Sequence, residues 1–232
     1  MKKFIYIFLF LSSFLIFSQE RTISVEYSLI VQPDKDLFKG NEIMTRLLAK
    51  AIEDAKNETF TLVIQKGNSK FYHNSILSKN DYSKTPLFAN YDGTIYTINN
   101  MQYIQCLLLG NDVFVKKETT KNWKITDETK MIDGYKCYKA TNVFVVITPK
   151  KVFNHPVVAW FCPDLPFNHG PNGYGNLPGL ILELQQFYSV YGVKKITLDS
   201  NISFSTNEIA KIKLISETER DEILEKGIHE RE

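Results

Sequence analysis

Four side chains that can ligate metals or exchange protons fall close together in the second half of the chain. His155, Cys162, Asp164 and His169 lie within 15 residues of one another. Imidazole, thiolate and carboxylate groups are the ligands that zinc prefers, so a metal centre is one interpretation of this cluster. However, their spacing matches no compact ligand pair. The four residues are therefore weak metal candidates, and we expect no cofactor.

Cys162 with His155 or His169 could instead supply a nucleophile and its base. That chemistry requires the thiol and the imidazole within hydrogen-bond reach of each other. No local signature of a cysteine hydrolase accompanies them, and no Ser/His/Asp order or pair of catalytic carboxylates stands out. We therefore expect a protein that is not an enzyme. A metal-dependent or cysteine-based periplasmic enzyme is the first alternative.

Glycines crowd the same segment, at positions 170, 173, 175 and 179. A phosphate-binding loop follows a strand, opens a helix and usually supplies a Lys or a Ser/Thr. Here the glycines precede an apolar run that reads as a strand, and no Lys lies among them. The segment is better explained as a buried crossing between two strands, with Pro178 and Gly179 at the centre of a type II turn.

The chain contains three cysteines, Cys106, Cys137 and Cys162. An odd number cannot be fully paired within one chain. Cys137 and Cys162 lie on segments that we expect to be neighbouring strands, so a disulfide between them is one interpretation. The other is that all three are small buried apolar residues, as free cysteines often are, and we favour it.

The elements that must position these residues are mostly strands. Residues 23–31 alternate between apolar and mostly polar side chains, which is typical of a half-buried strand. Residues 75–90 are polar and irregular and predict an insertion. Further strands are expected over residues 60–64, 71–72, 94–98, 102–109, 112–118, 123–126, 135–147, 157–161, 180–190 and 193–198.

Two helices are predicted. The longer one follows Asn41, a suitable N-cap, because apolar residues recur at helical spacing at Ile43, Met44, Leu47, Leu48, Ala51, Ile52 and Ala55. A short charged helix over residues 217–227 follows a capping box formed by Ser216 and Glu219. Many antiparallel strands with two helices predict an α+β fold. We expect one large, curved, mainly antiparallel sheet, like half of a barrel, with the long helix near the N-terminus and the short one at the C-terminus.

Residues 1–18 have the pattern of a secretory signal peptide. Lys2 and Lys3 precede an apolar run over residues 4–17, and Ser18 is a small residue before the expected cleavage site. The apolar run is short for a membrane span, and no later segment is long and apolar enough. We therefore expect residues 19–232 to form one exported β-rich domain in the periplasm, at the outer membrane or outside the cell.

The charge of the expected mature chain excludes one class of partner. Loss of Lys2 and Lys3 with the signal peptide lowers Lys plus Arg from 28 to 26, which equals the 26 Asp plus Glu. Proteins that bind nucleic acids need a basic surface to displace counterions from phosphates. We therefore expect no nucleic-acid partner, and consider a lipid, a peptide or another envelope protein instead.

Three stretches within residues 126–184 resemble the GLPGLI family of exported bacterial proteins. They read DETKMIDGYKCYKAT, AWFCPDLPFNHGP and NLPGLILEL. Asn176 stands where the family motif usually begins with glycine. The resemblance covers most of the chain and implies a shared layout, but the family has no established activity to carry over. The positions that carry the structural motif are Gly170, Pro171, Asn176, Leu177, Pro178, Gly179, Leu180 and Ile181.

The favoured hypothesis is a non-catalytic envelope protein that holds a hydrophobic ligand, a peptide or a client protein on a concave sheet. The expected layout is similar to half-barrel lipoprotein carriers, which is an analogy of fold. It predicts an apolar cavity, and its ligand-binding candidates are Trp160, Phe161, Pro166, Tyr174 and Leu177. A structural subunit of an envelope assembly is the remaining alternative.

Overall fold

One large sheet dominates the computed structural model, which describes residues 21–32, 38, 40–74, 88–147 and 151–229. The predicted signal peptide and residues 75–87 of the predicted insertion lie outside the described residues. The sheet has 12 strands in the order β12-β6-β5-β4-β3-β2-β1-β11-β10-β9-β8-β7. Their bounds are β1 (Ile23–Val31), β2 (Thr59–Gln65), β3 (Asn68–His73), β4 (Thr94–Ile98), β5 (Met101–Leu108), β6 (Asn111–Glu118), β7 (Lys124–Ile132), β8 (Tyr135–Ile147), β9 (Val152–Cys162), β10 (Leu180–Gln186), β11 (Ser189–Thr197) and β12 (Lys213–Ser216).

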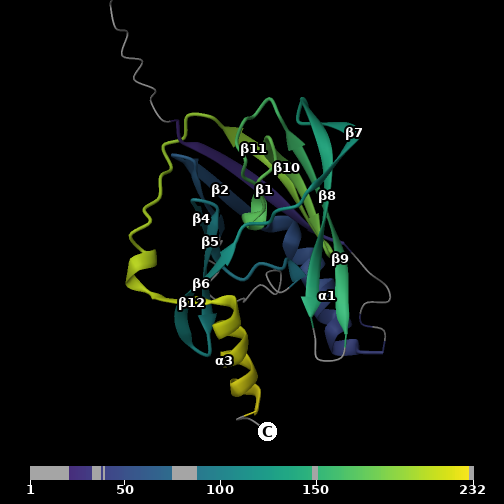
Figure 1. The fold of residues 1–232 in the computed structure, drawn as a ribbon. Coiled ribbons are helices and arrows are strands. Elements are labelled where there is room, and N and C mark those ends of the chain that lie inside the picture. Colours follow the sequence, from purple (N-terminus) through teal and green to yellow (C-terminus); the bar gives the residue numbers. More distant parts are fainter. Residues whose placement is uncertain (1–20, 33–37, 39, 75–87, 148–150, 230–232) are drawn as a thin grey trace, which may run out of the picture.

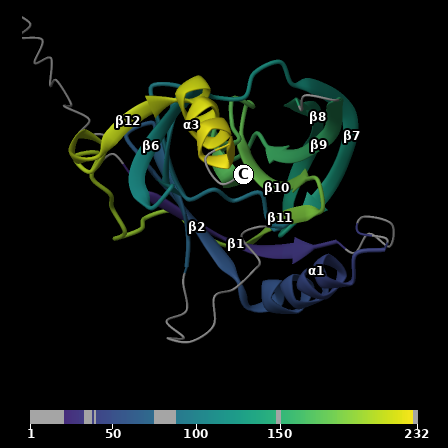
Figure 2. The same cartoon turned by 90° about the horizontal axis from the view of Figure 1, so that it is seen from below.

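The prediction of a large, mostly antiparallel sheet is confirmed, but the sheet is mixed. Every neighbouring pair is antiparallel except β12 and β6, which run parallel from Lys213 opposite Val113 to Ser216 opposite Lys116. The four residues of β12 are too few to show an alternating pattern, so this strand was not predicted. The sheet bends so that its two arms face each other (Figures 1 and 2). One arm ends in β6 and β12, and the other ends in β8 and β7.

The predicted contrast between a long and a short helix is wrong. α1 (Glu42–Asp54) continues as a 3-10 turn, η1 (Ala55–Asn57), and α3 (Glu217–His229) has 13 residues, as many as α1. Asn41 is the N-cap of α1, as predicted, and its Oδ1 accepts a hydrogen bond from Met44 N at 3.1 Å. The apolar stripe is only partly buried, because Ile43 in the first turn is 70% exposed whereas Leu48, Ala51 and Ala55 are buried.

Three strand boundaries differ from the predictions. The segment expected as one strand over residues 180–190 is divided into β10 and β11, because Phe187 adopts a φ of +54° and turns the chain back. β9 begins at Val152 rather than after Pro156, and Pro156 pairs with Val143 within the ladder. β7 extends to Ile132, beyond the predicted end at Thr126.

A cluster of aromatic rings forms the centre of the core. Tyr27, Phe60, Phe71 and Tyr191 come from four different strands and are fully buried. Phe60 and Phe71 stack with centroids 5.4 Å apart, and Tyr191 meets Phe60 edge-on at 5.2 Å. Such ring pairs stabilise a core by about 0.5–1.5 kcal/mol each beyond the area that they bury.

The crossing from β9 to β10 covers part of the same buried face. Its backbone is irregular, so its polar groups are satisfied by the sheet and by its own turns. Tyr27 donates its hydroxyl to Ile181 O at 2.7 Å, and Trp123 Nε1 donates to Gly175 O at 2.8 Å. Ile181 N donates to His169 O at 3.1 Å. The crossing is therefore a largely buried connection between two strands, as the sequence predicts.

The turn at the end of the crossing is not of type II. Gly179 has a φ of +155°, outside the range of that turn, and Leu180 N donates to Leu165 O rather than closing the turn on Leu177 O. The reason is close backbone contact: a Cβ at Gly179 would lie 2.1 Å from Cys162 O. Asn176 has a φ of +62°, a left-handed conformation that Asn tolerates better than most residues.

We predict that Gly179→Ala lowers the free energy of unfolding by at least about 3 kcal/mol, because it combines a disfavoured φ with a clash against backbone. Gly134→Ala is the matched control, since Gly134 has a φ of +80° but open space where a Cβ would lie. This control substitution should lower the free energy of unfolding by about 1 kcal/mol. Urea denaturation of both variants measures the difference, and equal losses would contradict a special role for the Gly179–Cys162 contact.

Candidate ligand-binding site

A polar cavity of about 400 Å³ lies between the two arms of the sheet. Cross-strand pairing sets Gln102 of β5 opposite Lys117 of β6, so their side chains project from the same face. Ile95 and Ile104 form the next pair on that face. The remaining lining comes from the segment before β4, the end of β6 and the residues after it, β8, β10, α3, and the 3-10 turn η2 (Pro171–Gly173) with the residue that follows it. These residues are Asn90, Asp92, Glu118, Thr120, Phe144, Asn172, Tyr174, Gln186, Glu217 and Arg220.

Lys117 is the main electrostatic feature of the cavity. Burial lowers the pKa of its ammonium, while the nearby Glu217 and Asp92 act in the opposite direction and Arg220 adds to the lowering. Among the described residues, no carboxylate forms an ion pair with Lys117. The cavity therefore contains a partly desolvated cation whose counter-charges stay beyond contact distance.

Several other polar groups in the wall have protein partners. Gln102 Nε2 donates to Gly173 O, and Asn172 Nδ2 donates to Asn90 O and to Gln186 Oε1, both at 3.0 Å. Glu118 pairs with Lys121 at 2.6 Å. These bonds hold the wall in place, and Lys117 adds a positive charge that has no ion-pair partner among the described residues.

A second, more apolar cavity of about 560 Å³ adjoins the first. The two share Asp92, Ile104 and Arg220 in their linings. Beyond these residues the second cavity is lined by Cys106, Leu107, Leu108, Val115, Asp221 and Leu224. We call the two together the α3 groove, because α3 contributes side chains to both. The α3 groove has a charged end and an apolar end.

Local interactions fix α3 over this groove. Ser216 and Glu219 form the predicted capping box: Glu219 N donates to Ser216 Oγ at 3.1 Å, and Ser216 N donates to Glu219 Oε2 at 2.7 Å. These bonds lower the pKa of Glu219. Near the other end, Gly227 lies so close to Leu109 that a Cβ would meet its Cδ1 at 3.0 Å. Figure 2 shows α3 opposite α1, next to β6.

The structure separates the ligand-binding residues expected from the sequence. Tyr174 lines the polar cavity, and burial raises the pKa of its hydroxyl. Phe161 and Leu177 are buried in the core, and Pro166 is exposed. Trp160 is half-buried, with Lys130 Nζ 4.4 Å from its ring centroid. Of the five, only Tyr174 borders the α3 groove.

The expected metal and nucleophile candidates have different surroundings. His155 packs on Phe187 with ring centroids 3.7 Å apart, whereas His169 donates from Nε2 to Gly67 O at 3.1 Å and burial lowers its pKa. Cys162 is buried and Asp164 is exposed. Within the described part of the chain, no group of three or more His, Cys, Asp or Glu residues could hold a metal ion.

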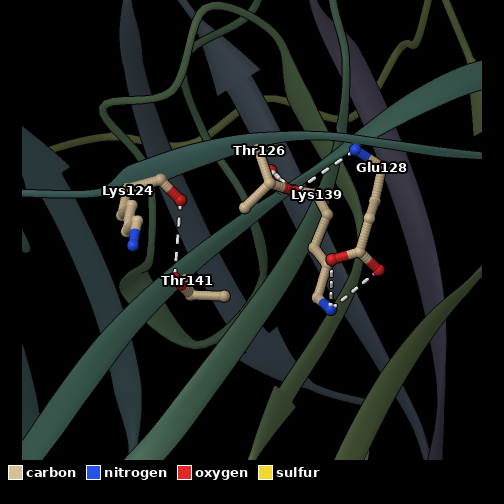
Figure 3. Close-up of polar contacts among 5 residues, drawn as sticks. All are labelled: Lys124, Thr126, Glu128, Lys139 and Thr141. Carbon is tan, nitrogen blue, oxygen red and sulfur yellow. Dashed lines mark hydrogen bonds and ion pairs between the residues drawn. The ribbon is translucent and has the colours of Figure 1, made fainter.

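A second concentration of polar residues, on β7 and β8, has a structural explanation. The pairing register shifts between Ile125 and Thr129, and Thr126, Glu128 and Lys139 interact across this bulge (Figure 3). Lys139 Nζ contacts both oxygens of Glu128, at 2.9 and 3.0 Å, and Glu128 N donates to Thr126 Oγ1. These polar groups form hydrogen bonds with one another at the edge of the sheet, where bulges are common.

Sequence reasoning missed the residues of the α3 groove. Asp92, Lys117, Glu217 and Arg220 are ordinary charged residues far apart in the sequence, without a motif. A faint signal was available at Lys117: it occupies an inward position of a strand whose other inward residues, Val113 and Val115, are apolar. An inward-facing Lys is costly unless it has a role, which makes such a residue a functional candidate.

One family model matches part of the chain, and the function of that family is unknown. A family described as a protein of unknown function (Porph_ging) matches residues 148–183, the segment that leads through β9 and the crossing into β10. This is consistent with the expected resemblance to an uncharacterised family. No curated protein matches the chain.

Solved structures of PNGF-II, in space groups P21 and C2, are similar to the chain in fold. Each matches with a TM-score of 0.52 and 14% sequence identity over 88% of this chain. The chain spans only about a third of the length of PNGF-II, 33% and 32% in the two crystal forms. At this identity the likeness concerns the fold alone.

Proposed function

We propose that the protein is an exported, non-catalytic binding protein that holds an amphipathic ligand in the α3 groove. The observation that carries the proposal is Lys117, a partly desolvated cation without an ion-pair partner among the described residues, at the charged end of a groove whose other end is apolar. An ionic head group would contact Lys117, and an apolar chain would lie along Ile104, Leu108 and Leu224.

Charge and shape both favour this ligand class. The charged end holds Lys117 and Arg220 beside Asp92 and Glu217, so it offers both signs to a zwitterionic head group. Charge-assisted hydrogen bonds are stronger than neutral ones, and they gain further where water is excluded. The two cavities have volumes of about 400 and 560 Å³, within the range of sites for small organic ligands.

The location and family are parts of the same proposal. The basic and apolar pattern of residues 1–18 supports export through a signal peptide. The motif from Asn176 to Ile181 supports membership of the GLPGLI family, and the Porph_ging match falls on the same region. Among the described residues, no helix is long and apolar enough to cross a membrane.

We predict that the purified protein binds dodecylphosphocholine below its micellar concentration and that Lys117→Gln weakens binding at least about 10-fold, since a charged hydrogen bond contributes about 1.5–3 kcal/mol. Lys116→Gln is the matched control, because Lys116 is the exposed neighbour on the same strand. It should bind like the unmodified protein. Isothermal titration calorimetry measures both, and absence of binding, or equal loss in the two variants, would reject the α3 groove as the site.

We also predict that Lys117→Gln raises the free energy of unfolding at pH 7, while Lys116→Gln leaves it nearly unchanged. The lowered pKa means that the folded state holds the Lys117 proton less tightly than the unfolded chain does. The buried ammonium therefore destabilises the fold fully below the folded-state pKa, and this cost disappears as the pH rises towards the unfolded value of about 10.4. Urea denaturation at pH 7 and pH 10 should show a larger gain at pH 7. A loss of stability at pH 7 would assign Lys117 a structural role.

A further inference from the structure

All three cysteines are free in the structure, with Cys137 and Cys162 fully buried and Cys106 half-buried. Cys137 and Cys162 lie on the neighbouring antiparallel strands β8 and β9. Tyr138 of β8 pairs with Phe161 of β9, and one further step along this register sets Cys137 opposite Cys162. Opposite residues in antiparallel strands have Cα atoms about 4.5–5.5 Å apart, with side chains on the same face. That separation is inside the range of about 4.4–6.8 Å that a disulfide spans.

The surroundings of the two thiols also favour a disulfide between them. Burial raises the pKa of Cys137 to about 12. The nearby Cys162 thiol makes the next largest contribution to this rise, as expected for two thiols that lie side by side. In the reduced form Cys137 Sγ lies 3.7 Å from Tyr135 O, a weak hydrogen bond that costs little to lose. Cys106 lies on β5, separated from β8 and β9 by several strands of the sheet.

We propose that Cys137 and Cys162 form a disulfide that joins β8 to β9 when the chain folds under oxidising conditions. The two thiols lose two protons and two electrons and form one S–S bond. A disulfide oxidant, either a small-molecule disulfide such as oxidised glutathione or a thiol–disulfide oxidoreductase, accepts them and leaves as two thiols. Cys106 stays reduced, which accounts for the odd number of cysteines.

The bond forms during folding rather than afterwards. A thiolate is the attacking species, and burial with a raised pKa makes the Cys137 thiolate scarce once the strands have closed. The position of the bond matters because Cys162 is the last residue of β9, where the crossing begins. Its carbonyl accepts a hydrogen bond from Leu165 N at 3.2 Å and is the group that excludes a side chain at Gly179.

The test is to denature and reduce the chain, refold it with a mixture of reduced and oxidised glutathione, and alkylate the thiols after denaturation. We expect one alkylated cysteine, Cys106, and a peptide pair linked through Cys137 and Cys162 in mass spectra. Three alkylated cysteines in the folded protein, or a linkage that includes Cys106, would overturn the proposal. Export is not assumed, so the result is independent of the cellular location.

A stability measurement separates this disulfide from chance oxidation. The bond closes a loop of about 25 residues in the unfolded chain, so the oxidised protein should melt roughly 5–10 °C above the reduced one. Cys106→Ser should keep this difference, because it leaves the proposed pair intact. Cys137→Ser and Cys162→Ser should each abolish it. An oxidised form that melts no higher than the reduced form would contradict a structural disulfide at this position.

Discussion

An irregular segment buried against a sheet must have its backbone polar groups paired, and this constraint shapes the whole molecule. The crossing between β9 and β10 contains only the short 3-10 turn η2 and one isolated bridge, so side chains from distant parts of the chain complete its hydrogen bonds. Trp123 and Gln102 donate to the carbonyls of Gly175 and Gly173 in the crossing, and Tyr27 donates to that of Ile181 at the start of β10. An unpaired buried amide would cost about 1–3 kcal/mol, so the crossing and the sheet depend on each other.

The same constraint decides where space for a ligand is left. The crossing and the segment at Phe88 and Ala89 occupy much of the inner face, and Ser189 and Tyr191 bind that second segment through the carbonyls of Phe88 and Ala89. The α3 groove is the part of the inner face that these segments do not fill, and its charged end is built from side chains of both arms and of α3. A hydrophobic ligand bound along the crossing, as the sequence led us to expect, would compete with the chain's own core.

Much of the fold was predictable because its signals are local. The alternation in β1, the Asn41 cap and the capping box at Ser216 and Glu219 each involve residues within one element, and the structure has all three. The errors concern features that a local pattern does not contain. β12 forms a strand because it hydrogen-bonds to the edge of β6. The burial of the apolar stripe of α1 depends on which part of the helix packs against the core. The α3 groove depends on which residues far apart in the sequence line the same cavity, such as Lys117 and Glu217.

By itself, the sequence determined the strand-rich class, the two helices and the Pro/Gly segment as a crossing between two strands. These properties follow from periodicity, capping and turn chemistry, which act over a few residues. Only the tertiary structure decided that no three of the four candidate ligands of the opening cluster are placed to hold one metal ion, and that Lys117 faces a cavity with Asp92, Glu217 and Arg220. The physical reason is that sheet register and curvature, not spacing along the chain, set which side chains meet.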